Sequence, residues 1–287
     1  MDLSTRMSRE FSAAKLVWGL IVFLQIVLLA CSMAATWATG ATLMFLGGAV
    51  LVIPVTSLVL KWRAETYHDR GERLRRAYVL QNALGQNPEP AAALATAATA
   101  TNLPKLDPEP IGEYFASPLP QGMQRLAENI GESAFYTWRI AALASYLCAG
   151  CAVAGMCVAV LVLWWAVQAG GPEQSQQHGL HEVALHLAKL FSDFFSFVAA
   201  GVFAELWWVY RFLSRNAECV FAESLRLAQQ ASPDSVAVFT NMGDYDTALV
   251  QAPPLPGTIK WLCNKRLAAL WAEHLNQNKS PRSLPNQ

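Results

Sequence analysis

Residues 140–167 read IAALASYLCAGCAVAGMCVAVLVLWWAV and contain no charged side chain. A transmembrane helix needs about 20 consecutive apolar residues, so this stretch is long enough to cross a bilayer and to tilt within it. Three further stretches, 16–37, 43–60 and 190–210, are apolar enough to do the same. The sequence therefore predicts four transmembrane helices, arranged as two hairpins.

The composition of the whole chain agrees with a membrane location. Of the 287 residues, 54% are hydrophobic and only 15% are charged, whereas about a quarter of the residues of soluble domains are charged. The 21 basic and 21 acidic residues cancel to a formal net charge of zero. This balance excludes a globally basic protein that binds a nucleic-acid polymer, and the expected partner is the lipid bilayer.

The distribution of Lys and Arg predicts the orientation in the membrane. All of these residues but Lys189 lie in 1–15, in 61–139 or from 211 onward, and Lys189 lies between the third and fourth stretches. Loops rich in Lys and Arg stay on the cytosolic side. Both termini and the central segment are therefore expected in the cytosol. Most of the ten Trp residues fall at the ends of the stretches, at the depth that indole side chains prefer.

The fold class predicted is an all-α integral membrane protein with helical cytosolic extensions. No alternating strand pattern occurs, and the extensions are expected at 61–84 (ending at Gly85), 121–139, 211–230, 235–242 and 259–275. The expected regions are a first transmembrane hairpin (1–61), a cytosolic helical block (62–138), a second transmembrane hairpin (139–213) with a short outer loop (169–189), and a C-terminal helical block with a disordered tail (214–287).

Two acidic residues, Asp193 and Glu205, lie in the fourth stretch. Ionisable groups at membrane depth face protein or water and mark functional sites by default. Asp193 is close enough to the outer end to reach the headgroups instead, and Glu205 either pairs with Lys15 or Arg139 or lines a conduction path. The candidate pore-lining residues are Asp193, Ser196, Ala200, Ala204 and Glu205. This polar and small-residue stripe suits tight helix packing equally well.

The densest basic patch comprises Arg70, Arg73, Arg75 and Arg76. It suits an anionic ligand or anionic headgroups near the membrane. It also suits a solvated helix face that Glu65, Asp69 and Glu72 partly neutralise.

No enzyme, metal or cofactor signature is present. The chain lacks a phosphate-binding glycine loop, a nucleophile elbow and a zincin motif, so we expect no catalytic residue and no cofactor. His178, Glu182 and His186 are spaced so that they share a helix face, with His181 nearby. Their spacing is not one of the specific zinc patterns, and we favour a solvated, pH-sensitive face. The six cysteines lie in the membrane or the cytosol, where no disulfide framework is expected.

Short motifs in both cytosolic blocks resemble the SMODS-associated four-transmembrane effector family. They are Tyr114-Phe-Ala-Ser117, Arg125-Leu-Ala-Glu-Asn129, Glu132-Ser-Ala-Phe135, Asp244-Tyr-Asp-Thr-Ala-Leu249 and Ala252-Pro-Pro-Leu-Pro256. The resemblance implies a pore-forming effector of the bacterial inner membrane that arrests or kills an infected cell. It also implies that a cyclic oligonucleotide from a neighbouring nucleotidyltransferase is the activating signal.

The expected mechanism combines the resemblance with the charge pattern. A cytosolic signal binds the helical blocks, and the protein oligomerises or rearranges and makes the membrane leak. The candidate ligand-binding residues are Arg73, Arg75, Arg76 and Arg125, and the candidate coupling residues are Glu132 and Asp244. Two alternatives are a constitutive small channel or transporter, and a non-conducting scaffold that recruits a partner through Phe115 and the Pro-rich loops.

Overall fold

The computed structural model describes residues 3–35, 41–85, 115, 117–169 and 180–279. Within these ranges every regular element is an α-helix and no strand occurs, which confirms the all-α prediction for the described part. The helices are α1 (Leu3–Ala35), α2 (Ala41–Leu84), α4 (Met123–Ala169), α5 (Leu180–Ala228), α6 (Ser235–Val250) and α7 (Gly257–Lys279).

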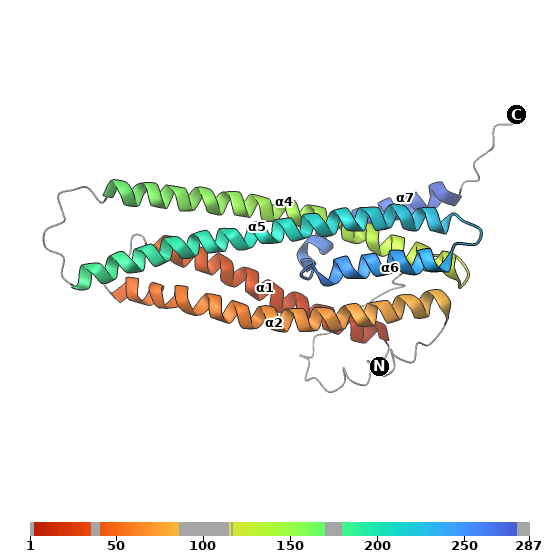
Figure 1. The fold of residues 1–287 in the computed structure, drawn as a ribbon, viewed down its shortest axis with the longest axis horizontal. Helices are drawn as coiled ribbons and strands as arrows, with labels where there is room; N and C mark the ends of the chain where they lie inside the picture. The colour runs from red at the N-terminus through yellow and green to blue at the C-terminus, as the bar shows by residue number, and fades with distance from the viewer. Residues whose placement is uncertain (1–2, 36–40, 86–114, 116, 170–179, 280–287) are drawn as a thin grey trace, which may run out of the picture.

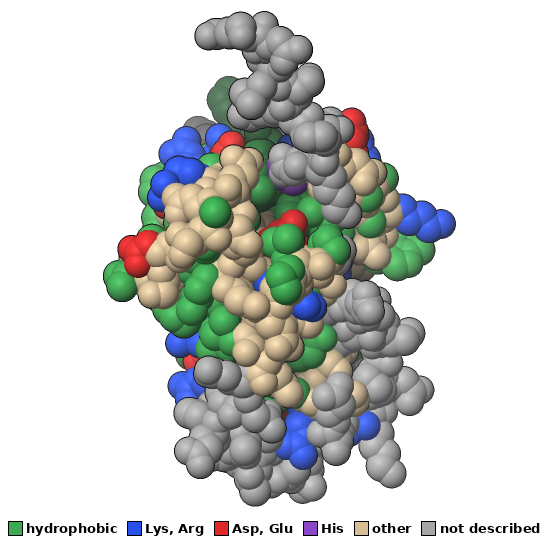
Figure 2. All heavy atoms as spheres, turned by 90° about the vertical axis from the view of Figure 1, so that its right-hand side faces the viewer, with side chains coloured by type: hydrophobic (Ala, Val, Ile, Leu, Met, Phe, Trp, Pro, Cys, Tyr) green, Lys and Arg blue, Asp and Glu red, His purple; other side chains and the backbone are tan. Residues whose placement is uncertain are grey.

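Four long helices run lengthwise beside one another and two shorter ones fold back at one end (Figure 1). α1 packs mainly against α2, and α4 mainly against α5, as the two predicted hairpins require. α1 begins and α7 ends toward the end of the molecule that holds α6. Viewed from that end, the surface carries Lys and Arg as well as Asp and Glu side chains (Figure 2).

In the described part of the chain, three helices are long and apolar enough to cross a membrane. The qualifying segments are Leu3–Cys31 of α1, Phe45–Leu84 of α2 and Met123–Cys157 of α4. The fourth predicted span, 190–210, lies within α5, and for residues 181–200 the structure describes only the helical backbone. Phe23 and Leu58 are 59% and 69% exposed, as expected of side chains that face lipid.

A heptad pattern of buried residues holds α4 against α5. Buried positions recur every three or four residues on both helices, the spacing typical of coiled coils. They are Ala127, Ile130, Ala134, Thr137, Ala141 and Ala144 on α4, and Leu213, Ala217, Val220, Ser224 and Leu227 on α5. The backbones approach closely, since a Cβ atom added to Gly131 would lie 3.1 Å from Ser224 Cβ.

Residues nearby in the sequence explain two of the helix ends in the part predicted to lie in the cytosol. α2 ends at Leu84 as predicted, because Gly85 adopts a φ of 67° and donates its N–H to the Gln81 carbonyl at 3.0 Å, a typical helix C-terminus. α6 begins after Asp234, whose side chain accepts from the Val236 N–H, as an N-cap residue does.

Two of the predicted helices are longer in the structure. The predicted end of α6 at 242 is wrong: the helix continues to Val250 because Tyr245 and Leu249 extend the buried stripe of Val238 and Met242. α7 continues past the predicted end at 275 to Lys279. The remainder of the predicted disordered tail, 280–287, lies outside the described residues.

The main core forms where α6 packs against the extensions of the long helices. Leu126 of α4 and Leu213 of α5 are at most 1% exposed and belong to one cluster with Met242 and Tyr245 of α6. A second cluster joins α7 to the long helices through Ile259, Leu267 and Trp271. The part of the molecule predicted to lie in the cytosol is therefore a packed bundle and not a set of loose extensions.

Replacing Leu126 by Ala tests this core. The side chain is fully buried, so we expect the free energy of unfolding in detergent to fall by about 2–5 kcal/mol. The control is Val236→Ala, since Val236 is 70% exposed and should change that free energy by less than about 0.5 kcal/mol. Equal effects of the two substitutions would contradict the packing described.

Candidate coupling site

An ionic cluster joins α2 to α6 inside the bundle that α6 forms with the ends of the long helices. Arg75 donates from Nε to Glu72 Oε2 and from Nη2 to Asp246 Oδ1, each at 2.6 Å. Arg76 lies 2.6 Å through Nε from the second oxygen of Asp246. We call Glu72, Arg75, Arg76 and Asp246 the ionic cluster. Its two positive and two negative charges balance.

Burial makes this cluster sensitive to the loss of any partner. The side chains of Arg75 and Asp246 are each 6% exposed and that of Glu72 is 9% exposed. Burial raises the pKa of Asp246, the guanidinium groups of Arg75 and Arg76 oppose this, and Glu72 adds to it. Asp246 therefore depends on both arginines to carry its charge in this environment.

The residues around the cluster tie α6 to three long helices at once. The Arg75 guanidinium lies 4.9 Å from the centre of the Tyr245 ring, and the Tyr245 hydroxyl is hydrogen-bonded to Thr137 of α4 at 2.7 Å. His68 Nε2 of α2 donates to the Leu249 carbonyl at 3.3 Å. Asn241 donates to Ser224 of α5 at 2.8 Å. A movement of α6 would therefore change its contacts with α2, α4 and α5 together.

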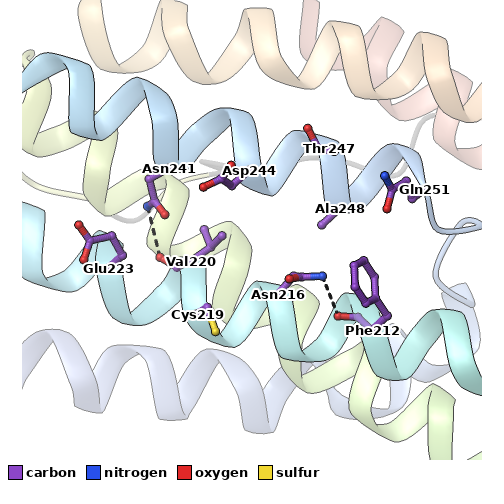
Figure 3. Close-up of a pocket in the computed structure, with 10 residues that line it drawn as sticks. All are labelled: Phe212, Asn216, Cys219, Val220, Glu223, Asn241, Asp244, Thr247, Ala248 and Gln251. Atoms are coloured by element: carbon purple, nitrogen blue, oxygen red, sulfur yellow. Dashed lines mark hydrogen bonds between the residues drawn. The ribbon is translucent and has the colours of Figure 1, made fainter.

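An open groove of about 430 Å³ lies on the other side of α6, between α6 and α5. Figure 3 shows Asn241 and Asp244 of α6 and Glu223 of α5 toward one end, with Phe212 and Gln251 toward the other. Its lining residues are Phe212, Asn216, Cys219, Val220, Glu223, Asn241, Asp244, Thr247, Ala248 and Gln251. None of these ten is basic, so the groove lacks the cations that an anionic ligand needs.

The charge of Glu223 in this groove is already balanced. Arg226 donates to both of its carboxylate oxygens, at 2.5 and 2.8 Å. This hydrogen bonding lowers the pKa of Glu223. Asp244, the other carboxylate of the groove, is exposed.

The structure separates the four arginines predicted to bind a ligand. Arg75 and Arg76 meet in the ionic cluster, where Arg75 is 5% exposed. Arg125 lies elsewhere and donates to the Asn82 side chain at 3.2 Å and to the Leu119 carbonyl at 3.1 Å. Arg73 is exposed, and the Arg76 side chain is 54% exposed. Arg73 and Arg76 are the members of the set that a ligand from solution reaches most easily.

The two predicted coupling residues occupy different environments. Glu132 of α4 is 6% exposed, and it adds to the effect of burial in raising the pKa of Tyr136. Asp244 faces the groove. Asp246, which forms the ion pairs between α2 and α6, was not predicted from the sequence. Extending the helix to Leu249 would have placed Asp246 one turn after the buried Met242, and that was the signal available.

The predicted pore-lining residues are only partly described. Asp193, Ser196 and Ala200 fall in the part of α5 described by its backbone alone, so those predictions are not tested. Ala204 is exposed. Glu205 is 3.9 Å from the Lys61 ammonium of α2, and both side chains are substantially exposed. The pairing of Glu205 with Lys15 or Arg139 is therefore replaced by one with Lys61, and Arg139 stacks on the Trp138 ring at 4.0 Å.

The histidines predicted on the outer loop are not placed in detail. His178 lies outside the described residues, and His181, Glu182 and His186 lie where only the backbone of α5 is described. Within the described part of the chain, no group of three or more His, Cys, Asp or Glu side chains is arranged to hold a metal ion. All six cysteines are free.

Comparison with known proteins gives no relative from which to transfer a role. No protein-family model, no curated protein and no solved structure matches this chain. The functional argument therefore rests on the residues and their geometry.

A separate buried carboxyl lies where α1 meets α2. Glu10 is 1% exposed, and neither of its oxygens has a hydrogen-bond partner among the residues that the structure describes. Burial raises its pKa, and the positive charge of Arg70 opposes this. The helices are close here, since a Cβ atom on Gly71 would lie 2.9 Å from the Phe11 ring. Ionised Glu10 therefore costs folding free energy that protonated Glu10 does not.

Asp246→Asn tests the ionic cluster against a matched control two residues away. Removing the charge leaves Arg75 buried with Glu72 alone, and we expect the free energy of unfolding to fall by about 3 kcal/mol. Asp244→Asn changes the same functional group on an exposed position and should shift it by less than about 0.5 kcal/mol. Denaturant unfolding in detergent measures both. An Asp246→Asn protein as stable as the Asp244→Asn protein would show that the cluster contributes nothing.

Glu10→Gln should stabilise the protein in a pH-dependent way. Folding raises the pKa of Glu10. The loss of stability caused by ionised Glu10 is therefore absent below the pKa of Glu10 in the unfolded chain and complete above its pKa in the folded protein. The melting temperature of the variant should therefore exceed that of the parent at neutral pH, and the difference should vanish at acidic pH. A difference that is independent of pH would exclude ionisation of Glu10 as the cause.

Proposed function

We propose that the protein is a pore-forming effector of the bacterial inner membrane, opened by an anionic signal that binds its cytosolic bundle. It crosses the membrane four times, with both termini in the cytosol, and works as a homo-oligomer. The signal class is a cyclic oligonucleotide made by a neighbouring nucleotidyltransferase, as the resemblance to the four-transmembrane effector family implies. Leakage of the membrane would then arrest or kill the infected cell.

The continuity of the long helices is the observation that carries this proposal. α2, α4 and α5 have 44, 47 and 49 residues and run without a break from apolar stretches into the cytosolic bundle. At 1.5 Å per residue, each is about 66–74 Å long, roughly twice the 30 Å hydrocarbon core. Rotation or separation of their cytosolic halves is therefore transmitted directly to their membrane halves.

The ionic cluster supplies a latch that an anion can compete for. Asp246 holds α6 on α2 through Arg75 and Arg76. A phosphate group that pairs with exposed Arg73 and Arg76 competes with Asp246 for Arg76, because a guanidinium binds phosphate as well as carboxylate. Weakening this contact loosens α6 on α2, and the rearranged spans let ions through.

One feature weighs against a scaffold that recruits a partner through Phe115. That side chain is 4% exposed and lies against the Tyr78 ring, with the ring centres 6.1 Å apart. It is therefore part of the core and not an exposed docking residue.

Membrane depolarisation in a bacterial host tests the proposal. The protein is expressed with a membrane-potential dye, with and without a nucleotidyltransferase that makes cyclic oligonucleotides. We expect the parent protein to depolarise cells only when the nucleotide is made. Asp246→Asn should depolarise them without it, because the latch is weakened, and Asp244→Asn should behave as the parent.

The other outcomes separate the alternatives, provided that equal amounts of each variant are in the membrane. Depolarisation by the parent protein without the nucleotide would indicate a constitutive channel. No depolarisation under either condition would favour a non-conducting scaffold. A scaffold should also be indifferent to Glu205→Gln, whereas a conducting protein should change its leak.

A further inference from the structure

The turn between α6 and α7 lies at the cytosolic ends of the predicted spans. The Tyr210 hydroxyl of α5 donates to the Pro254 carbonyl in this turn at 3.1 Å. A Cβ atom added to Gly257, the first residue of α7, would lie 3.5 Å from Lys15 Cδ of α1. Tyr210 and Lys15 mark the inner ends of the fourth and first predicted spans. α7 therefore starts at the level of the cytosolic membrane boundary.

One face of α7 is anchored in the bundle. Ile259, Leu267 and Trp271 are 6%, 6% and 3% exposed and belong to one cluster with Trp18 of α1 and Tyr210. From this anchored start, α7 runs back toward the end of the molecule that lies away from the predicted membrane (Figure 1). Its position and direction are thus fixed by packing.

The opposite face of α7 presents two large apolar side chains near its start. Trp261 is 77% exposed and Leu262 is 70% exposed. An exposed Trp beside an exposed Leu is uncommon on a surface that meets only water. In a helix each side chain leans toward the N-terminus, which for α7 is the membrane side. Trp261 and Leu262 therefore lean toward the membrane boundary.

Basic residues complete the pattern. Lys265 and Arg266 follow Trp261 and Leu262 by four residues, so each lies one turn further from the membrane on the same faces. Both are exposed, as is Lys260. The first acidic residue of α7 is Glu273. This half of α7 is therefore basic, and its charge is complementary to the anionic phosphates of a cytosolic leaflet.

Other exposed tryptophans lie at the inner ends of the second and fourth predicted spans. Trp62 of α2 and Trp208 of α5 are 70% and 67% exposed, and they lie one residue after Lys61 and three residues after Glu205, the pair that joins the two helices at 3.9 Å. Indole side chains gather at the headgroup level of membrane proteins. Trp261 adds an exposed indole on the C-terminal helix at the same end of the predicted spans.

We propose that the first two turns of α7 rest in the headgroup region of the cytosolic leaflet, with Trp261 and Leu262 inserted and Lys265 and Arg266 against anionic lipid phosphates. The occupant of this face is a lipid surface. The inference rests on the membrane placement in the proposed function but not on pore opening, so it holds or fails independently of any leak.

Quenching of Trp261 by brominated lipid tests the insertion. The full-length protein and its Trp261→Phe variant are reconstituted in vesicles that contain phosphatidylglycerol, with or without bromine on the upper acyl chain. The difference between the two proteins isolates the fluorescence of Trp261, which we expect to lose most of its intensity in brominated vesicles. The control is Trp271→Phe, since Trp271 lies on the buried face of the same helix and its fluorescence should be unchanged.

A second measurement tests the charge. Replacing phosphatidylglycerol by phosphatidylcholine, or introducing Lys265→Glu with Arg266→Glu, should weaken the quenching of Trp261. Equal quenching in neutral lipid would overturn the role of anionic headgroups. If brominated lipid leaves the fluorescence of Trp261 unchanged, the whole inference is overturned. If that fluorescence then depends on the number of protein copies per vesicle, this face is assigned to a second copy of the chain. The readout needs no conducting state, so it separates this inference from the depolarisation assay.

Discussion

Backbone hydrogen bonding in lipid is the constraint on which the rest of this structure depends. Because no water reaches the hydrocarbon core, each spanning segment must pair its own N–H and C=O groups, and an unbroken helix does this. α2, α4 and α5 keep the same helix as they leave the apolar stretches, with no interruption at Lys61, Arg139 or Arg211. The part of the molecule predicted to meet the cytosol is therefore built from the same helices as the part suited to lipid.

The heptad pattern of buried residues between α4 and α5, which we call the seam, continues from the part predicted to lie in water into the part predicted to lie in lipid. At the end where α6 packs, in the part predicted to lie outside the membrane, it buries Ala127 and Ile130, where removal of apolar surface from water favours packing. Toward the third predicted span it buries Ala141 and Ala144. Lipid offers no hydrophobic driving force between helices, and the small side chains of Ala141 and Ala144 allow the close van der Waals contact that stabilises packing there. The register is kept across the change of medium because the heptad spacing is continuous.

The sequence predicted what local patterns determine. Hydropathy located three of the spans, and Gly85 marked the end of α2, because both signals lie within one segment. The pairings around α6 were beyond such reasoning: Arg75 and Asp246 are 171 residues apart, and their contact follows from how the hairpins pack. The same limit explains why Lys15 and Arg139 were the only partners considered for Glu205, while packing brings α2 and Lys61 beside it. Part of the missing information was available, since the 3–4 spacing of Val238, Met242, Tyr245 and Leu249 continues past the predicted end of α6.

α6 is held by apolar packing as well as by polar contacts, and this combination favours a limited shift of the helix over its complete release. Val238, Met242 and Leu249 are buried in the main core. Asn241, Tyr245 and Asp246 hold α6 by polar contacts, which a charged ligand or water can replace. Its last turn leads into the segment fixed by Tyr210 and into α7, whose anchor is the apolar set Ile259, Leu267 and Trp271. Neither water nor a charged ligand can replace apolar contacts of this kind. Loss of the ionic cluster would therefore remove the charged contacts between α6 and α2 while the apolar packing of α6 and of α7 remains, so α6 would shift on α2 and α7 would stay in place.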